Sequence, residues 1–140
     1  MESDRTVIKK SGTSILFLDS RCRVLLLLRD DIPSIPYPNT WDLPGGHVEP
    51  HETPRQCITR EMMEEMDLDI EPFRFFRVME FADRDEYVFW KKADFDIDRI
   101  RLNEGQRLGW FSWEEACALP LAFGFNAVVD LFFKSRMWET

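Results

Sequence analysis

Apolar residues come in short runs divided by polar turns, a pattern typical of a sheet with interspersed helices. The first two runs, residues 14–19 and 23–29, lie close together and are joined by polar residues, which predicts a β-hairpin. Residues 30–40 follow as a loop, because Pro33, Pro36 and Pro38 exclude a helix there. A loop of that length in a compact domain often has a function.

The later runs predict a second set of elements. Strands are expected at residues 73–81 and 87–95, around a polar turn at 82–86, and at 108–111. Helices are expected at residues 113–118 and 126–134. Strands that surround one central helix, with a helix at the end of the chain, predict an α/β sandwich with a mixed sheet.

The central helix is the most clearly marked element. Residues 53–56, Thr-Pro-Arg-Gln, supply an N-cap, a proline for the first helical position and the glutamine of a capping box. Ile58, Met62 and Met66 recur every fourth residue and predict the buried stripe. Asp67 stands where the helix is expected to end, in a left-handed conformation that glycine prefers and aspartate adopts at a cost of about 1 kcal/mol or less.

The composition indicates a folded, acidic protein. Of 140 residues, 44% are hydrophobic and 14% aromatic, as in globular chains rather than disordered ones. This length predicts one domain spanning residues 1–140. Eighteen basic against 26 acidic residues give a net charge of −8, which argues against long nucleic acid as a partner, because polymer binding uses a basic face. A small anion is a suitable partner if a metal neutralises the charge.

The sequence shows neither a secretory signal nor a membrane segment. Residues 1–10 have no apolar stretch behind their charges, and residues 24–28, the longest strongly apolar run, fall far short of the roughly 20 residues that cross a bilayer. Cys22, Cys57 and Cys117 are odd in number and widely spaced, which disfavours a disulfide framework or zinc site and predicts three buried thiols. We therefore expect a cytoplasmic protein without a membrane partner, either a monomer or a homodimer.

The central helix concentrates carboxylates on one side. Glu61, Glu64 and Glu65 lie at i, i+3 and i+4, where like charges repel by a few tenths of a kcal/mol per pair. A solvated charged face is the ordinary interpretation of such a cluster. Here, however, the Pro-Gly-Gly of residues 44–46 precedes the helix and lets backbone approach a ligand closely. Hard oxygen donors beside an open carbonyl suit Mg²⁺ or Mn²⁺, so we predict a metal site.

The spacing of these residues resembles the Nudix box, Gly-x5-Glu-x7-Arg-Glu-U-x-Glu-Glu-x-Gly-U, where U is bulky and aliphatic. Gly46, Glu52 and the Arg-Glu-Met-Met-Glu-Glu of residues 60–65 match the six fixed glycine, glutamate and arginine positions through Glu65. At about one chance in ten for each position, such a match arises on the order of once in a million placements. Asp67 replaces the last glycine of the box, which shapes a helix end and holds no metal, so we expect a small loss of stability and intact chemistry.

The resemblance implies an α/β/α sandwich in which the box forms loop, helix and loop. It also implies a Mg²⁺- or Mn²⁺-dependent hydrolase of phosphoric anhydride bonds in small nucleotides. Residues 104–106, Glu-Gly-Gln, resemble in particular a motif of the MutT-type nucleoside triphosphate pyrophosphohydrolases. The expected reaction cleaves a nucleoside triphosphate to monophosphate and pyrophosphate, with oxidised purine nucleotides such as 8-oxo-dGTP among the candidate substrates.

The resemblance further implies roles for individual residues near the metal. The ligands would be the carbonyl of Gly45 and the carboxylates of Glu61, Glu64, Glu65 and Glu104. Glu61 and Glu104 are the two candidates for the catalytic general base.

Other residues are assigned to structure or to substrate binding. Gly46, Glu52 and Arg60 are expected to be structural, with an ion pair between Glu52 and Arg60 that fixes the loop against the helix. Arg29, at a strand end, is a candidate for binding the α-phosphate as a bidentate fork, and a solvated strand end is the alternative. Asn126 matches the asparagine with which MutT-type enzymes read a purine edge, and helix capping is its alternative role.

Other substrates stay open at this point. Diadenosine polyphosphate hydrolases of the family tend to carry a tyrosine beyond the box, and Tyr87 lies near that place. ADP-ribose hydrolases tend to carry a proline there, and this chain has none between Pro72 and Pro120. Nucleotide sugars are a further alternative. A non-catalytic nucleotide sensor is disfavoured, because such modules usually lose box glutamates and this chain retains them all.

Overall fold

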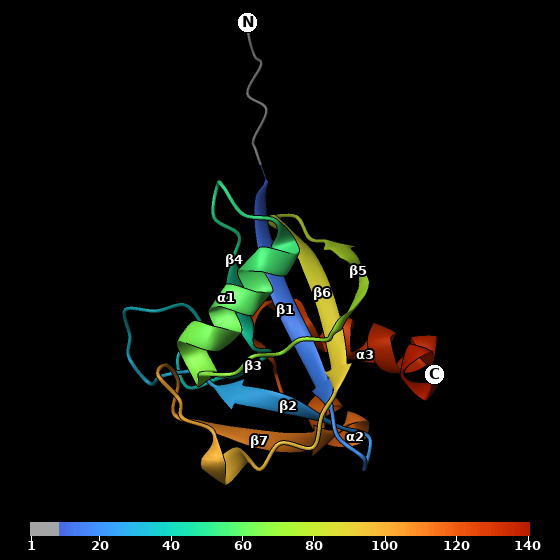
Figure 1. Cartoon of the computed structure of the whole chain (residues 1–140). Helices are drawn as coiled ribbons and strands as arrows, with labels where there is room; N and C mark the ends of the chain where they lie inside the picture. The colour runs from blue at the N-terminus through green and yellow to red at the C-terminus, as the bar shows by residue number, and fades with distance from the viewer. Residues whose placement is uncertain (1–8) are drawn as a thin grey trace, which may run out of the picture.

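The computed structural model describes residues 9–140, which form a sheet between helices (Figure 1). The expected absence of a secretory signal concerns residues 1–10 and lies almost wholly outside the described part. The strands among the described residues are β1 (Lys10–Leu18), β2 (Arg23–Leu28), β3 (Trp41–Asp42), β4 (Gly45–His47), β5 (Arg74–Glu80), β6 (Arg84–Lys92) and β7 (Arg107–Ser112). The helices are α1 (Pro54–Met66), α2 (Trp113–Cys117) and α3 (Phe125–Ser135), with 3₁₀ turns η1 (Ile97–Arg99), η2 (Ala122–Gly124) and η3 (Met137–Glu139).

The strands form one mixed sheet with β1 at its centre. The order is β3-β2-β1-β6-β5, with β4 also pairing with β1 and β7 with β2. β1 runs parallel to β6 along its whole length, from Lys10 beside Arg84 to Leu18 beside Lys92. On its other side, β1 pairs with β4 near its start and with β2 only at its end. β2 therefore diverges from β1 and carries β3 and β7 away with it (Figure 1).

Both faces of the sheet are covered, which explains the nearly continuous apolar runs in β1 and β2. Successive residues point to opposite faces: Ile15 and Phe17 share a core cluster with Met62 of α1, whereas Leu16 shares one with Phe132 of α3. Figure 1 shows α1 lying across the near face of β1. The expected α/β/α sandwich with a mixed sheet is confirmed.

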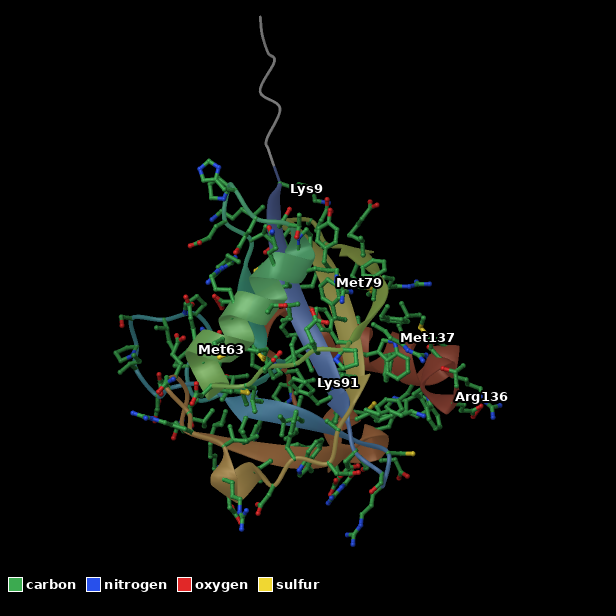
Figure 2. All side chains as sticks on the ribbon, viewed as in Figure 1. Lys9, Met63, Met79, Lys91, Arg136 and Met137 are labelled. Atoms are coloured by element: carbon green, nitrogen blue, oxygen red, sulfur yellow. The ribbon has the colours of Figure 1, made fainter. Side chains whose placement is uncertain are left out.

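The ends of α1 follow the sequence pattern. The Thr53 hydroxyl accepts from the Gln56 backbone N–H at 3.2 Å, and the Gln56 amide oxygen accepts from the Thr53 N–H at 2.9 Å. Asp67 ends the helix in the left-handed conformation, with φ 54° and ψ 38°. Met62 is fully buried, whereas Met63, labelled in Figure 2, is 46% exposed. β7, α2 and α3 likewise lie close to the residues predicted for them.

The polar turn expected at residues 82–86 is wrong in its extent. β6 begins at Arg84 and ends at Lys92, so it lies earlier than the expected strand at 87–95. The Phe81 N–H donates to the Arg84 carbonyl oxygen at 2.9 Å, which closes a tight reversal. Arg84 and Glu86 are only 7% and 2% exposed. They can lie buried in a strand because Arg84 Nε donates to Glu86 Oε1 at 2.7 Å, which compensates both charges.

The expectation of three buried thiols is correct only for Cys57. Cys22, in the turn after β1, and Cys117, at the end of the short α2, are exposed. All three cysteines are free, as expected. Separately, no helix within residues 9–140 is long and apolar enough to cross a membrane.

Candidate active site

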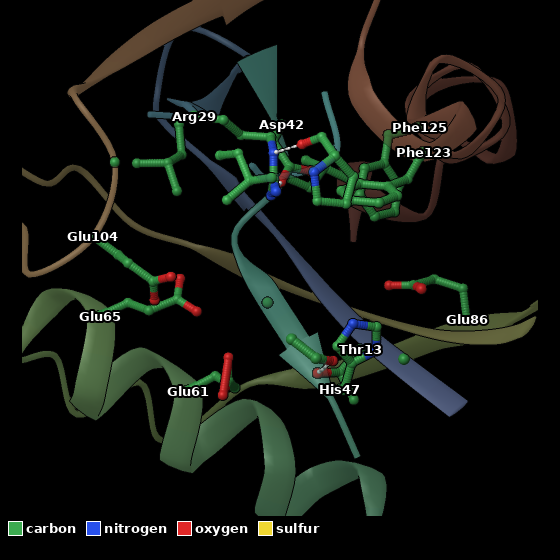
Figure 3. Close-up of a pocket in the computed structure, with 18 of the residues that line it drawn as sticks. Thr13, Arg29, Asp42, His47, Glu61, Glu65, Glu86, Glu104, Phe123 and Phe125 are labelled. Carbon is green, nitrogen blue, oxygen red and sulfur yellow. Dashed lines mark hydrogen bonds and ion pairs between the residues drawn. The ribbon is translucent and has the colours of Figure 1, made fainter. Parts of the chain in front are cut away.

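A cavity of about 640 Å³ opens where β1, β2, β4, β6, α1 and η2 converge. This volume lies within the range of about 300–1,000 Å³ that is typical of small-molecule sites. Figure 3 separates its acidic side chains into two groups, with Glu61, Glu65 and Glu104 on one side and Glu86 on the other. The Phe123 ring lies toward the Glu86 side.

Glu65 is the buried member of the first group. It is 8% exposed, and no ion pair in residues 9–140 involves it. Burial, a hydrogen bond with Glu61 and the charges of Glu61 and Glu104 together raise the pKa of Glu65 to about 10, with burial contributing most. Since like charges surround a carboxylate that has no basic partner, this corner of the cavity favours a cation.

Arg60 lies beside this group and binds several carboxylates at once. The expected pair with Glu52 is present, since Nε donates to Glu52 Oε2 at 2.9 Å and Nη2 donates to Oε1 at 2.6 Å. These bonds lower the pKa of Glu52 to about 2. Arg60 Nη1 also donates to Glu61 Oε1 at 2.7 Å and to Glu64 Oε1 at 3.0 Å. The guanidinium therefore joins the loop before α1 to the carboxylates on α1.

The two glycines of β4 bring the backbone against these side chains. Gly45 has φ +154°, and a Cβ there would overlap the Thr13 carbonyl oxygen on β1. A Cβ on Gly46 would overlap Oε2 of Glu61. Glycine is needed at both places so that β4 packs on β1 and the Glu61 carboxylate packs on β4. Gly45 lines the cavity beside Glu61, in agreement with its predicted place at the candidate metal site.

The loop that carries Glu104 is tied to both α1 and the loop after β2. The Asn103 side chain donates to the Glu64 carbonyl at 2.7 Å, and its backbone N–H donates to the Glu65 carbonyl at 2.8 Å. Gln106 donates through Nε2 to the Arg29 carbonyl at 2.8 Å. These bonds position Glu104 beside the end of α1, opposite Glu65 in Figure 3.

Glu64 differs from its neighbours. It does not line the cavity, and its side chain is 60% exposed and paired with Arg60. Within residues 9–140, no three carboxylate, histidine or cysteine side chains already stand close enough together to hold a metal ion. The donors nevertheless suit a hard divalent cation, because Glu61, Glu65 and Glu104 are oxygen ligands and Glu65 lacks a compensating charge.

Arg29 lines the cavity, but some of its guanidinium N–H groups already donate hydrogen bonds within the protein. Nη1 donates to Asp42 Oδ2 at 3.0 Å, Nε donates to the Pro36 carbonyl at 3.0 Å, and the guanidinium lies 5.0 Å from the Phe123 ring centroid. Burial raises the pKa of Asp42 to about 6, although Arg29 opposes the rise. Asp42 Oδ1 is buried without a hydrogen-bond partner in the described part of the chain. Arg29 thus reaches the cavity wall while holding Asp42.

Asn126 is not brought to this cavity. Its Oδ1 accepts from the Leu121 N–H at 2.9 Å, and its Nδ2 donates to the carbonyls of Leu119 at 2.9 Å and Ala116 at 3.3 Å. The amide thus fixes the connection between α2 and α3, and Asn126 is absent from the cavity lining. The purine-reading role expected from the sequence does not fit this placement.

The sequence patterns missed several charged residues that line the cavity, among them Asp42, Arg84 and Glu86. Arg84 and Glu86 were assigned to a turn. Opposite charges two residues apart lie on the same face of a strand, so the spacing of Arg84 and Glu86 could have indicated an ion pair within a strand. Asp42 follows Trp41 in the segment leading to the box, and nothing local distinguishes it from a surface aspartate.

Comparisons with known proteins agree with this architecture. A family model described as NUDIX domain matches residues 9–131. The MutT protein from Methanosarcina mazei Go1 superposes with a TM-score of 0.73 over 92% of this chain and 96% of that one, at 22% identity, which shows a shared fold. The chain is 34% identical to the CTP pyrophosphohydrolase of Escherichia coli (strain K12) over 99 residues, 69% of this chain and 73% of that protein.

A second relative is longer than this chain. Diphosphoinositol polyphosphate phosphohydrolase 2 of Rattus norvegicus is 30% identical over 117 residues, which make up 81% of this chain and 63% of that protein. The chain belongs to the NUDIX domain family, which confirms the resemblance drawn from its sequence. Membership supports the expectation of a hydrolase that acts on phosphoric anhydride bonds.

Proposed function

We propose that the chain is a Mg²⁺- or Mn²⁺-dependent pyrophosphohydrolase that cleaves a nucleoside triphosphate to the monophosphate and pyrophosphate. The observation that carries this proposal is the burial of Glu65 beside Glu61 and Glu104 with no ion pair of its own in residues 9–140. A divalent cation stabilises such a group, and it also binds the phosphates of a nucleotide. The similarity to a CTP pyrophosphohydrolase supports the substrate class.

The residues that would hold the metal are Glu61, Glu65, Glu104 and the carbonyl of Gly45, with Glu64 joining them when it releases Arg60. When bound, the metal neutralises phosphate charge and lowers the pKa of a coordinated water. The chain's own contribution is positioning, since phosphoryl transfer asks for little covalent chemistry from the protein. Arg29 would turn its remaining guanidinium N–H groups toward the phosphates while keeping its bond to Asp42.

Contacts of the two candidate bases favour Glu104 as the proton acceptor. Glu61 Oε1 accepts from Arg60 Nη1 at 2.7 Å, and Oε2 lies against Gly46, so a guanidinium already holds this carboxylate. Glu104 forms no ion pair in residues 9–140, and its loop is held in place through Asn103. A carboxylate free of a basic partner accepts a proton more readily than one held by a guanidinium. Glu61 would then serve as a metal ligand.

A diphosphoinositol polyphosphate, the substrate class in the name of the rat relative, fits this cavity less well. Glu86 lines the side remote from Glu65 (Figure 3). A ring carrying many phosphates needs several unpaired basic side chains there, and Arg84 on that side is already paired with Glu86. Diadenosine polyphosphates, ADP-ribose and nucleotide sugars share the diphosphate and belong in the same test.

The test is an initial-rate screen with Mg²⁺ on the common nucleoside triphosphates, 8-oxo-dGTP, ADP-ribose, a nucleotide sugar, diadenosine polyphosphates and a diphosphoinositol polyphosphate. Products are identified by chromatography. We expect monophosphate and pyrophosphate from a triphosphate, and loss of activity in EDTA. Glu65→Gln should lower kcat by orders of magnitude, and Glu80→Gln, on the exposed part of β5, is the matched control. If the protein cleaves ADP-ribose, a nucleotide sugar, diadenosine polyphosphates or the diphosphoinositol polyphosphate but no triphosphate, the proposed substrate class is wrong. If it cleaves none of these compounds, the proposed hydrolase activity is wrong.

We also propose that residues 1–140 form a single domain that works in the cytoplasm. The family match spans nearly all of the described residues. Cys22 and Cys117 are exposed and free, as is usual in a reducing compartment.

A further inference from the structure

Glu86 is a buried carboxylate that the proposed reaction does not use. It extends from β6 toward the centre of the cavity, on the side opposite Glu61, Glu65 and Glu104 (Figure 3). Its side chain is 2% exposed, so it is as buried as the apolar core residues. Because it lies across the cavity from the proposed metal ligands, binding of the metal does not explain its burial. A charge is retained in such a place either to pair with a neighbour or to meet a ligand.

Arg84 occupies one oxygen of Glu86 and is itself fixed. Its Nε donates to Glu86 Oε1 at 2.7 Å, its Nη2 donates to the Phe123 carbonyl at 2.8 Å, and its guanidinium lies 4.3 Å from the Phe81 ring centroid. Held from several directions, the guanidinium orients the carboxylate. Arg84 Nε bonds to Oε1 and not to Oε2, and the buried Ser14 hydroxyl lies near the same carboxylate, so Oε2 can meet a ligand from the cavity side.

The surroundings of Glu86 are aromatic. Phe123 and Phe125 line the same side of the cavity, and the ring of Tyr37, from the loop after β2, lies 4.7 Å from that of Phe123. Aromatic walls bind flat rings by stacking. Burial raises the pKa of Glu86, while the hydrogen bond and charge of Arg84 and a hydrogen bond from Ser14 oppose the rise. The ion pair with Arg84, in which Nε and Oε1 lie 2.7 Å apart, favours a carboxylate that accepts hydrogen bonds, so a ring bound here must present N–H groups.

We propose that Glu86 selects the nucleobase of the substrate by accepting hydrogen bonds from an exocyclic amino group. This inference rests on the proposed function. Guanine, whose amino group adjoins a ring N–H, offers two neighbouring donors and is bound best. Cytosine and adenine offer an amino group beside an acceptor and follow. Uracil and thymine present one N–H between two carbonyls, which the carboxylate repels, and are bound worst.

The test compares kcat/KM for GTP, CTP, ATP and UTP in the wild type and in Glu86→Gln. We expect the wild type to favour GTP over UTP by about 10- to 100-fold, the discrimination usual for one good pair of hydrogen bonds to a base. Glu86→Gln replaces an acceptor by a donor, so it should lose most of that ratio by slowing GTP while UTP is unchanged or faster. Asp85→Asn is the matched control, since Asp85 is the adjacent β6 residue, does not line the cavity and pairs with Lys9.

A second variant moves the carboxylate without changing its charge. Gly12 faces Glu86 across the β1–β6 pairing, and a Cβ there would lie 2.5 Å from Glu86 Oε1. Gly12→Ala should therefore displace the Glu86 carboxylate from its place beside Arg84 and reduce the GTP to UTP ratio, with a lower melting temperature but a folded protein. It carries the test if Glu86→Gln does not fold.

The outcomes separate this inference from the proposed function. Equal losses on all four substrates in both variants would mean a purely structural ion pair and would overturn base selection alone. A wild type that cleaves triphosphates without base preference would do the same. Preference for CTP over GTP would keep the amino-group contact and overturn the ranking. A wild type that cleaves no triphosphate would overturn the proposed function together with this inference.

Discussion

Glu65→Gln should make the metal-free protein more stable while removing its activity. The pKa of Glu65 is 4.5 in an ordinary environment and is raised to about 10 in the folded chain, first by burial and then by Glu61. At neutral pH the native carboxyl is protonated and the unfolded one is ionised, so folding takes up a proton. Stability from this group is therefore complete below pH 4.5 and falls as pH rises toward the folded pKa.

The size of the effect follows from this interval. Each pH unit above the unfolded pKa lowers the free energy of unfolding by about 1.4 kcal/mol. From 4.5 to neutral pH the loss is about 3 kcal/mol, and it is insensitive to the folded value as long as that lies well above 7. A glutamine does not ionise, so it adds no pH dependence of this kind to the free energy of unfolding. A gain of this size corresponds to a rise of roughly 10 °C in Tm for a domain of this length.

The assay is urea unfolding of the wild type and Glu65→Gln in EDTA across a pH series. The difference in free energy of unfolding should be small near pH 5, about 3 kcal/mol near pH 7 and larger near pH 8.5. Mg²⁺ should then stabilise the wild type more than the variant, because binding to the native state alone raises stability. Glu80→Gln, on exposed β5, should show no pH-dependent difference. A variant that is less stable at every pH, or a difference that does not grow with pH, would refute the reasoning.

Three further substitutions test particular contacts. Asp67→Gly relieves a left-handed conformation at φ 54° and should leave Tm unchanged or raise it by a few degrees; a clear fall in thermal melting would reveal a role for the aspartate side chain. Gly46→Ala places a Cβ against Oε2 of Glu61, so kcat should fall at least about tenfold with a loss of about 1–3 kcal/mol in stability, and normal kinetics would show that the carboxylate is free to shift. Asn126→Ala removes the bonds that join α2 to α3 and should cost about 1–3 kcal/mol in unfolding free energy, with base preference unchanged. Altered base preference at normal stability would restore the purine-reading role.

Features whose causes lie within a few residues could be predicted from the sequence. The capping box of residues 53–56, the stripe of Ile58, Met62 and Met66, and the left-handed Asp67 all depend on neighbours within one or two helical turns. The ion pair between Glu52 and Arg60 followed from a motif whose spacing encodes a loop folded back on a helix. Short apolar runs divided by polar turns predicted the strands, and the order of strands and helices along the chain predicted the sandwich.

Placement of charges in the cavity did not follow from such local signals. Arg84 and Glu86 looked like turn residues, because a pattern of single positions does not reveal that two charges compensate each other inside a strand. Asn126 stands at the expected residue near the start of α3, yet its amide is used by carbonyls of the preceding connection. Asp42 has a raised pKa chiefly because tertiary packing buries it, although Arg29 lowers that pKa.

By itself, the sequence determined the elements, the family motif and the chemical type of the candidate site. The tertiary structure decided which carboxylates the cavity contains. Glu64 and Glu65 are adjacent on α1, but only Glu65 turns inward, under the loop tied down by Asn103, while Glu64 stays exposed on Arg60. The physical reason is that burial of a charge depends on partners from segments distant in the chain, and these meet only when β1, β4, β6 and α1 pack together.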